Sequence, residues 1–275
     1  MSPFEAILLG IVQGLTEFLP VSSSGHLVLF QHLLGFRQPE ILFDVCLHVG
    51  TLAAICAVFI KEIVQILTTL LHLPAKSRAA GGLRNLYRTD ESARMAALIV
   101  AGSLPTAVLG LLFHRFAERI FSSVALVGAM LLLTGCLLWF TRRVTDPGRP
   151  VSGLTVKDAL LVGLAQGMAI MPGISRSGAT ISAALFSGVD RETAGRYSFL
   201  LSIPAILGAL VLETDASITQ TSIPVSIMLF GAAAAAGIGY AALKLLLFVV
   251  RHGKLYRFAP YCWLAGATAM LLGLR

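Results

Sequence analysis

The chain has 275 residues, of which 56% are hydrophobic and 13% are charged, and its mean hydropathy is +0.84. Soluble domains carry about 25% charged residues, so this composition excludes a soluble globular protein and predicts an all-α integral membrane protein. The formal net charge of +7 does not indicate nucleic-acid binding, because basic cytoplasmic loops of a membrane protein account for it.

The first predicted element, residues 3–34, is apolar but is broken in its middle by the polar run QGLTEFLPVSSSGH at residues 13–26. Backbone groups at such a break are tolerated at membrane depth only where they are buried in protein or line a wet cavity. We therefore predict a helical hairpin that re-enters the membrane.

Three apolar stretches follow at residues 43–60, 95–113 and 121–141, and each is long enough for a transmembrane helix. The loop after the first stretch and the segment after the third are both rich in Lys and Arg, which places them in the cytoplasm. The turn between the second and third stretches carries Arg115 and Arg119 and fits this topology least well.

A segment rich in Pro and Gly, residues 145–152, is the predicted joint between two halves, 1–146 and 152–275, of a single membrane domain. The second half begins with another broken apolar region at 159–189 and continues with three spans at 197–213, 224–250 and 258–274. Each half is thus one re-entrant hairpin plus three transmembrane helices. Because three is odd, the sequence predicts an inverted-topology repeat whose hairpins meet tip to tip near the bilayer midplane.

A weaker copy of the first polar run lies in the second half, as QGMAIMPGISRSG at residues 166–178. Five positions recur at a constant offset of 153 residues, which pairs Gln13 with Gln166 and places Arg176 opposite Ser23. Two polar breaks in an apolar chain, one with an acid and one with a base, indicate a duplicated site within the membrane.

Glu17 is the first candidate for chemistry, because an ionisable group in a membrane segment costs about 2.5–3.5 kcal/mol on insertion scales. Gln13 lies four residues earlier and therefore on the same face of a helix. Oxygen ligands of this kind suit a hard divalent cation, Mg²⁺ or Ca²⁺, with water or substrate phosphate completing its coordination. Glu17 could instead act as an acid or base rather than as a metal ligand. The simpler alternative is a Glu17 that only faces water at the interface.

His26 ends the first run, in a turn region that should point into the cavity. Its imidazole is suited to proton transfer or to nucleophilic attack on phosphorus. Three alternatives remain open: His26 attacks directly, Ser23 attacks with His26 as its base, or His26 activates a water. A buried structural histidine is the simpler reading. Asp44 and His48, also four residues apart, are weaker candidates that either support the site or form a local ion pair.

Arg176 is the corresponding candidate in the second run, because a guanidinium presents a planar fork of donors that matches phosphate. Its neighbours add hydroxyl and backbone donors. The predicted phosphate-binding set is Ser22, Ser24, Ser175, Arg176, Ser177 and Gly178. An ion pair between Arg176 and Glu17 that serves the fold alone is compatible with this role.

The two runs resemble the two signatures of the undecaprenyl pyrophosphate phosphatase, or bacitracin-resistance, family. QGLTEFLPVSSSGH at 13–26 is similar to the first signature and PGISRSGAT at 172–180 to the second, and the stretches at 33–36 and 104–114 extend the resemblance. Gln13 stands where the family's acidic motif has Glu or Gln, and Ser24 stands where many members have Thr.

The resemblance implies a multi-pass hydrolase of the bacterial inner membrane that converts the C55 isoprenyl diphosphate to the monophosphate. This reaction recycles the lipid carrier for peptidoglycan synthesis and confers bacitracin resistance, and the family is linked to divalent cations. The charge pattern places the first hairpin, and with it the active site, toward the outside. The sequence leaves a homodimer open.

Two other classes fit parts of the sequence. A secondary transporter or lipid-carrier flippase would use the same inverted-repeat cavity, but a simple anion site needs no imidazole beside a carboxylate. A phosphatidic-acid-type lipid phosphatase shares only the Ser-Gly-His order at residues 24–26 and ranks below both.

Overall fold

The computed structural model describes residues 1–34, 41–114, 123–145, 147–217 and 223–273. All regular secondary structure in these ranges is helical, apart from one isolated bridge between Arg149 and Val189, so the predicted all-α class is confirmed. Three sequence features fall outside the described residues: the turn with Arg115 and Arg119, most of the loop at 214–222, and residue 146 at the boundary of the first half.

Both broken regions consist of two helices separated by a short break, as the polar runs predict. In the first region α1 (Pro3–Phe18) precedes the break and α2 (Ser23–Leu33) follows it. The longer helices after this hairpin are α3 (Ile41–Val58), α7 (Glu91–His114) and α9 (Val124–Phe140). In the second region α10 (Val156–Met168) precedes the break and α11 (Arg176–Phe186) follows it. The helices after this hairpin are α12 (Arg191–Ser217), α13 (Val225–Arg251) and α14 (Ala259–Gly273).

Local chemistry accounts for the ends of the hairpin helices. Ser2 and Thr155 each begin a helix, α1 and α10, with a capping box in which an acidic residue three positions later returns the hydrogen bond. Helix α1 stops at Leu19, whose backbone is extended, because the following Pro20 disfavours the helical conformation in the residue before it.

Four helices are long and apolar enough to cross a membrane, α7, α9, α12 and α13, and they coincide with four of the six predicted spans. The predicted span at 43–60 is only part of a bent pair, since residues 42–58 and 60–71 meet at 83°. Helix α14, within the predicted last span, has 15 residues. The chain is therefore a multi-pass membrane protein by composition and helix length, while the full count of six spans stays a prediction.

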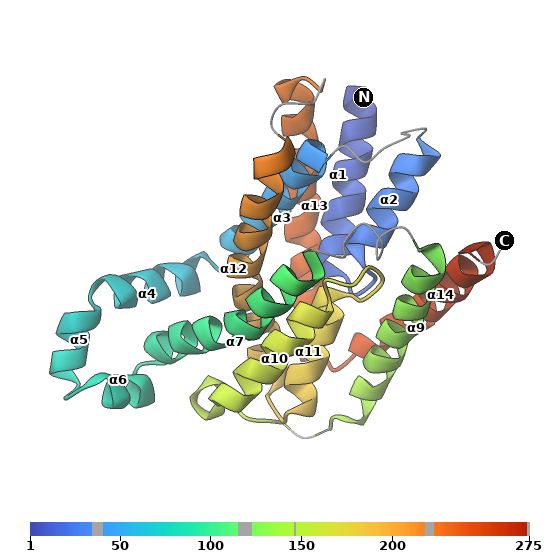
Figure 1. The fold of residues 1–275 in the computed structure, drawn as a ribbon. Coiled ribbons are helices and arrows are strands. Elements are labelled where there is room, and N and C mark those ends of the chain that lie inside the picture. Colours follow the sequence, from blue (N-terminus) through green and yellow to red (C-terminus); the bar gives the residue numbers. More distant parts are fainter. Residues whose placement is uncertain (35–40, 115–122, 146, 218–222, 274–275) are drawn as a thin grey trace.

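The segment predicted as a basic loop after the first span is helical. It forms α4 (Ile60–Leu71), α5 (Leu73–Ala79) and α6 (Leu83–Thr89), which make the arm at the left of Figure 1. Helix α4 is amphipathic, with Ile60, Val64 and Leu67 exposed on one side and Thr69 buried on the other. The apolar spacing i, i+4, i+7 of Ile60, Val64 and Leu67 predicts this helix, whereas the Lys and Arg content of the whole segment is typical of a loop.

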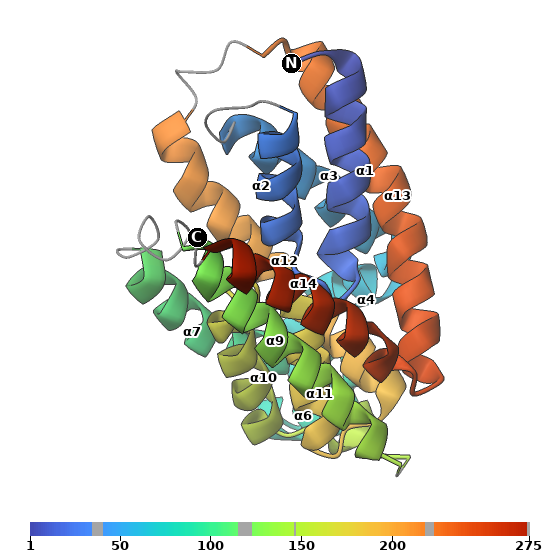
Figure 2. The same cartoon turned by 90° about the vertical axis from the view of Figure 1, so that its right-hand side faces the viewer.

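The hairpin of each half packs against a long helix of the other half, α1 against α13 and α10 against α7, while α9 packs against α14 (Figures 1 and 2). Small residues permit these crossings. A Cβ atom at Gly10 would lie 2.3 Å from the Gly231 carbonyl oxygen, and one at Gly163 would lie 1.9 Å from the Gly102 carbonyl oxygen. Gly10 and Gly163 differ by the same 153 residues as the two polar runs.

Figure 1 shows α1 and α2 above the middle of the molecule and α10 and α11 below it, so that the breaks of the two hairpins face each other. The predicted joint at residues 145–152 is tied to the lower hairpin, because Arg149 pairs with both carboxylate oxygens of Asp158 at 3.0 Å and also donates to the Ser187 carbonyl oxygen at 2.7 Å.

Candidate active site

The tips of the two hairpins are hydrogen-bonded to each other. The Gly173 backbone N–H donates to Ser22 Oγ at 3.1 Å, and Ser177 Oγ donates to the Phe18 carbonyl oxygen at 2.8 Å. Gly173 has φ +95°, and a Cβ there would lie 2.3 Å from the Val127 carbonyl oxygen, so only glycine fits this turn. Ser22 is the one non-glycine residue with positive φ in the described ranges, at +70°. The hydrogen bond between the tips thus joins two residues, Ser22 and Gly173, that both have positive φ.

Glu17 lies at the centre of the polar residues that the tips bring together. Its Oε1 pairs with the guanidinium of Arg176, and its Oε2 accepts hydrogen bonds from Ser23 Oγ at 2.7 Å and from Gln13 Nε2 at 3.1 Å. The Glu17 side chain is buried. Arg176, Ser23 and Gln13 all donate to the carboxylate, which is the environment that a buried carboxylate anion requires. The structure therefore brings Glu17, Arg176 and Ser23, three of the four predicted catalytic residues, into one cluster.

His48 also belongs to this cluster, although the sequence ranked it low. Its Nδ1 lies 3.1 Å from Gln13 Nε2 and 3.8 Å from Glu17 Oε2. Because an amide N–H only donates, Nδ1 acts as the acceptor in this contact. The spacing to Asp44 was misleading, since Asp44 accepts a hydrogen bond from Gln31 Nε2 at 2.6 Å instead. A histidine inside an apolar span is the sequence signal that points to this position.

His26 is placed differently from the expectation that it points into the cavity. Its Nδ1 lies 2.8 Å from the Ser22 carbonyl oxygen, and its Nε2 lies 2.5 Å from Tyr261 Oη. Ser22, Ser23 and Ser24 line the main cavity, whereas His26 is absent from the described residues that line it. The structure therefore does not bring His26 into contact with Glu17 or Arg176.

The predicted phosphate-binding residues divide into two groups. Ser22, Ser24, Ser175 and Arg176 line the cavity. Ser177 and Gly178 do not: the Ser177 hydroxyl is committed to the Phe18 carbonyl oxygen, and the Gly178 N–H donates to Ser175 Oγ at 3.2 Å as part of the cap of α11. The Ser177 hydroxyl and the Gly178 N–H therefore stabilise the second tip and do not face the cavity.

The cavity has a volume of about 580 Å³ and two chemically distinct ends. One end carries Glu17, the serines of both tips and Arg176. The other end is apolar and runs between α7 and α12, where Leu111, Phe113, Ile206 and Leu210 line it. A charged end joined to an apolar arm suits an amphiphile with an anionic head and a hydrocarbon chain.

The predicted cation site is only partly provided for. No group of three or more His, Cys, Asp or Glu side chains that could hold a metal occurs in the part of the chain that the structure describes. Both Glu17 oxygens already accept from protein donors, and Gln13 turns Nε2 rather than Oε1 toward Glu17. Gln13 Oε1 is buried without a hydrogen-bond partner among the described atoms. Of the two predicted ligands, Glu17 therefore offers one carboxylate and Gln13 one amide oxygen.

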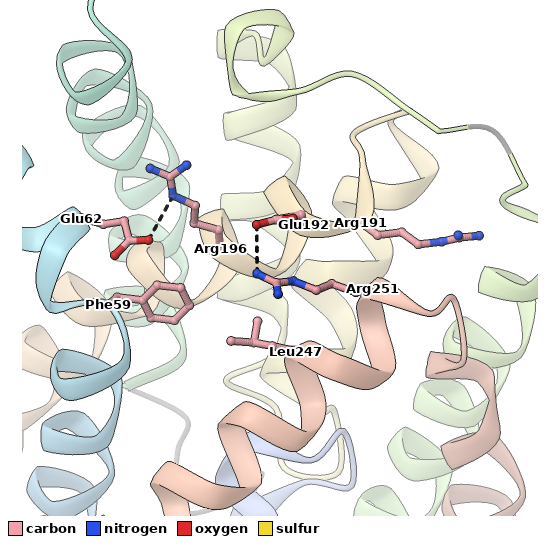
Figure 3. Close-up of a pocket in the computed structure, with 7 residues that line it drawn as sticks. All are labelled: Phe59, Glu62, Arg191, Glu192, Arg196, Leu247 and Arg251. Carbon is pink, nitrogen blue, oxygen red and sulfur yellow. Dashed lines mark hydrogen bonds and ion pairs between the residues drawn. The ribbon is translucent and has the colours of Figure 1, made fainter.

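A second, much smaller pocket of about 40 Å³ lies where α4, α12 and α13 meet, and Figure 3 shows it in close-up. Arg251 Nη2 lies 2.9 Å from Glu192 Oε1. Arg196 Nε lies 3.9 Å from Glu62 Oε1, and Arg196 Nη1 lies 2.7 Å from Glu91 Oε1. Both of these guanidinium groups are paired with carboxylates, and Arg191, which also lines the pocket, donates to the Val144 carbonyl oxygen at 2.9 Å. We regard it as a structural ion-pair cluster.

Comparisons with known proteins agree with the geometry. The sequence model of the family described as bacitracin resistance protein BacA matches residues 6–268. A relative from Desulfatibacillum aliphaticivorans, named undecaprenyl-diphosphatase, is 54% identical over 268 residues, which are 97% of each chain. Relatives with the same name from Desulfosudis oleivorans and Methanosphaera stadtmanae are 47% and 40% identical over 276 and 270 residues, covering all of both chains in the first case and 98% and 97% in the second.

Proposed function

The chain belongs to the bacitracin resistance protein BacA family, and from this membership we infer that it is an undecaprenyl-diphosphatase. It is a membrane hydrolase that dephosphorylates undecaprenyl diphosphate to undecaprenyl phosphate, and its cell-wall and resistance roles follow from the family. The observation that carries this function is the cluster of Glu17, Ser23 and Arg176 at the charged end of the cavity. A transporter or flippase needs no nucleophile beside a carboxylate and is not favoured.

We propose that the diphosphate lies at the charged end and the prenyl chain in the apolar arm. The phosphates then compete with Glu17 for the guanidinium of Arg176, which stabilises the charge that develops on phosphorus-bound oxygens. As Arg176 turns to the substrate, Glu17 is freed to act as a base. Ser22, Ser24 and Ser175 offer further hydroxyl donors along the same wall of the cavity.

Ser23 is the nucleophile that the geometry supports best, because its hydroxyl already donates to Glu17 Oε2. In the first step Ser23 Oγ attacks the terminal phosphorus and its proton passes to Glu17. The phosphoanhydride bond breaks and undecaprenyl phosphate leaves with the bridging oxygen. In the second step water attacks the phosphoserine, and phosphate leaves as Oγ regains a proton. We assign His26 to this second step, as the acceptor of the water proton after its ring turns from Tyr261 toward the cavity.

The test uses purified protein and undecaprenyl diphosphate labelled with ³²P in the terminal phosphate. Ser23→Ala is expected to lose turnover and to bind no covalent label. His26→Ala is expected to release phosphate 10²–10⁴ times more slowly and to accumulate acid-stable label on the protein. Acid-labile label on Ser23→Ala would make His26 the nucleophile instead. Full phosphate release by His26→Ala would remove His26 from the reaction, and no release by the unaltered protein would contradict the function itself.

A divalent cation, Mg²⁺ or Ca²⁺, is also part of the proposal; Glu17 and Gln13 are the residues that would hold it. When bound, such an ion would supply charge neutralisation for the diphosphate. The same assay run with a chelator and then with each metal tests this. Equal phosphate release with and without chelator would exclude the ion.

The apolar arm gives a prediction about chain length. Gly208 lines the cavity, and a Cβ built there meets no described heavy atom within 4 Å, so Gly208→Leu projects into open space. We expect kcat/KM for the C55 substrate to fall at least tenfold, because about 1 Å of misplacement at the reacting group costs roughly a hundredfold. A short-chain C10 diphosphate should be affected less.

Gly237→Leu is the matched control for this prediction, because Gly237 is exposed on α13, outside the cavity lining, and its Cβ position is equally open. Activity of the two variants on both substrates, measured as phosphate release, gives four rates. An equal loss on long and short substrates in Gly208→Leu would place the prenyl chain elsewhere.

We further propose that the two halves form an inverted repeat in the bacterial inner membrane, with the charged end of the cavity facing outside. The opposite directions of the hairpins, the exchanged packing of α1 on α13 and α10 on α7, and the shared offset of 153 residues support it. A cysteine at Val225, exposed at the start of α13, should then react with an impermeant reagent added to intact cells. A homodimer stays a prediction.

A further inference from the structure

The imidazole of His26 is hydrogen-bonded at both of its nitrogens. Nδ1 faces the Ser22 carbonyl oxygen at 2.8 Å, and Nε2 faces Tyr261 Oη at 2.5 Å. The two rings also stack, with centroids 5.8 Å apart and planes inclined by 19°. Tyr261 lies near the start of α14, 235 residues from His26, and belongs to neither polar run.

These contacts select one tautomer of His26. A carbonyl oxygen only accepts hydrogen bonds, so Nδ1 carries the proton. The neutral ring then has its lone pair on Nε2, and the Tyr261 hydroxyl donates to it. Nε2 is thereby kept unprotonated, which is the state that an imidazole must have before it accepts a proton from water.

Helix α14 is held firmly enough to give Tyr261 a fixed place beside the first tip. Cys262 Sγ, in the next residue, donates to the Pro20 carbonyl oxygen at 3.2 Å. Farther along, α14 crosses α9 at a glycine pair, where a Cβ on Gly266 would lie 2.8 Å from the Gly128 carbonyl oxygen. The tyrosine hydroxyl and the Ser22 carbonyl oxygen therefore hold the ring from two elements that are themselves joined.

We propose that Tyr261 is a positioning residue for His26: together with the Ser22 carbonyl it holds the ring in the Nδ1–H tautomer, so that Nε2 is unprotonated when the ring turns to the cavity. This inference rests on the role proposed above for His26. Tyr261 acts through the imidazole and touches no substrate, so its loss should change the rate of the chemical step and leave substrate binding as it is.

The test compares Tyr261→Phe, which keeps the ring and loses the hydroxyl, with Tyr256→Phe, a nearby tyrosine that packs edge-on against Trp139. Tyr261→Phe is expected to lower kcat about tenfold with KM changed less than twofold, whereas Tyr256→Phe should match the unaltered protein. In ¹⁵N-histidine-labelled protein, the Nε2 resonance of His26, assigned by its absence from His26→Gln, should move in Tyr261→Phe only.

Unaltered kcat or an unmoved His26 resonance in Tyr261→Phe would overturn the proposal. So would a further fall in rate when Tyr261→Phe is added to His26→Ala, because a residue that acts through His26 has no effect once the imidazole is gone. Full turnover in His26→Ala alone would instead reject the proposed role of His26, while the resonance comparison would still test the contact with Tyr261.

Discussion

Replacement of Arg176 by lysine is expected to lower turnover at least a hundredfold while the protein stays folded. Lysine keeps the positive charge beside Glu17, but it offers a point charge in place of a planar fork that can hold two phosphate oxygens at once. Loss of one preorganised donor to a developing oxyanion typically costs about 10²–10³ in rate. Phosphate release gives the rate, and thermal unfolding of the same sample establishes that the fold is intact.

Arg142→Lys is the matched control, because Arg142 follows α9 and stacks its guanidinium 4.0 Å from the Trp139 ring centroid, away from the cavity. It should change turnover less than twofold. If Arg176→Lys kept more than a third of the normal rate, charge alone would be sufficient at this position. Arg176 would then serve chiefly as the counterion of Glu17.

Gly163→Leu is expected to prevent the protein from folding. A Cβ at this position would lie 1.9 Å from the Gly102 carbonyl oxygen and 2.7 Å from its carbonyl carbon, and backbone atoms cannot turn aside as a flexible side chain can. Helices α10 and α7 would have to separate along their crossing. Overpacking typically costs about 1–3 kcal/mol, and a backbone clash exceeds that range.

The measurement is the yield of monodisperse protein extracted from membranes, followed by its thermal unfolding. Gly237→Leu adds the same side chain where nothing lies within 4 Å and should be recovered like the unaltered protein. Recovery of Gly163→Leu at the normal yield and melting temperature would mean that the close approach of α7 and α10 is dispensable.

The two breaks could be predicted from the sequence because they are set by local chemistry: Pro20 stops α1, and Gly173 supplies the positive φ of the second tip. The meeting of Glu17 with Arg176 could be predicted because the polar runs repeat at a constant offset. The family signatures lie in short stretches of the chain, and the membrane class follows from its composition.

Other features depend on packing between distant elements and left no local signal. The bend of 83° at Phe59 involves neither proline nor glycine. The direction of His26 is decided by Tyr261 on α14, and the membership of His48 in the cluster by the approach of α3 to α1. A pattern of residue types identifies which side chains are suited to chemistry, whereas the helices beside them decide which way those side chains turn.

The exchanged packing of the hairpins has a consequence for biosynthesis. Gly10 reaches its partner Gly231 only after 221 more residues have been made, which takes roughly 10–40 s at about 5–20 residues per second. During much of that interval the nascent first hairpin carries Glu17 with no Arg176 to neutralise it. An unneutralised carboxylate is costly in hydrocarbon, so the first hairpin must remain near water or the insertion machinery until the second arrives. The ion pair at the centre of the site therefore forms only after the second hairpin has been made.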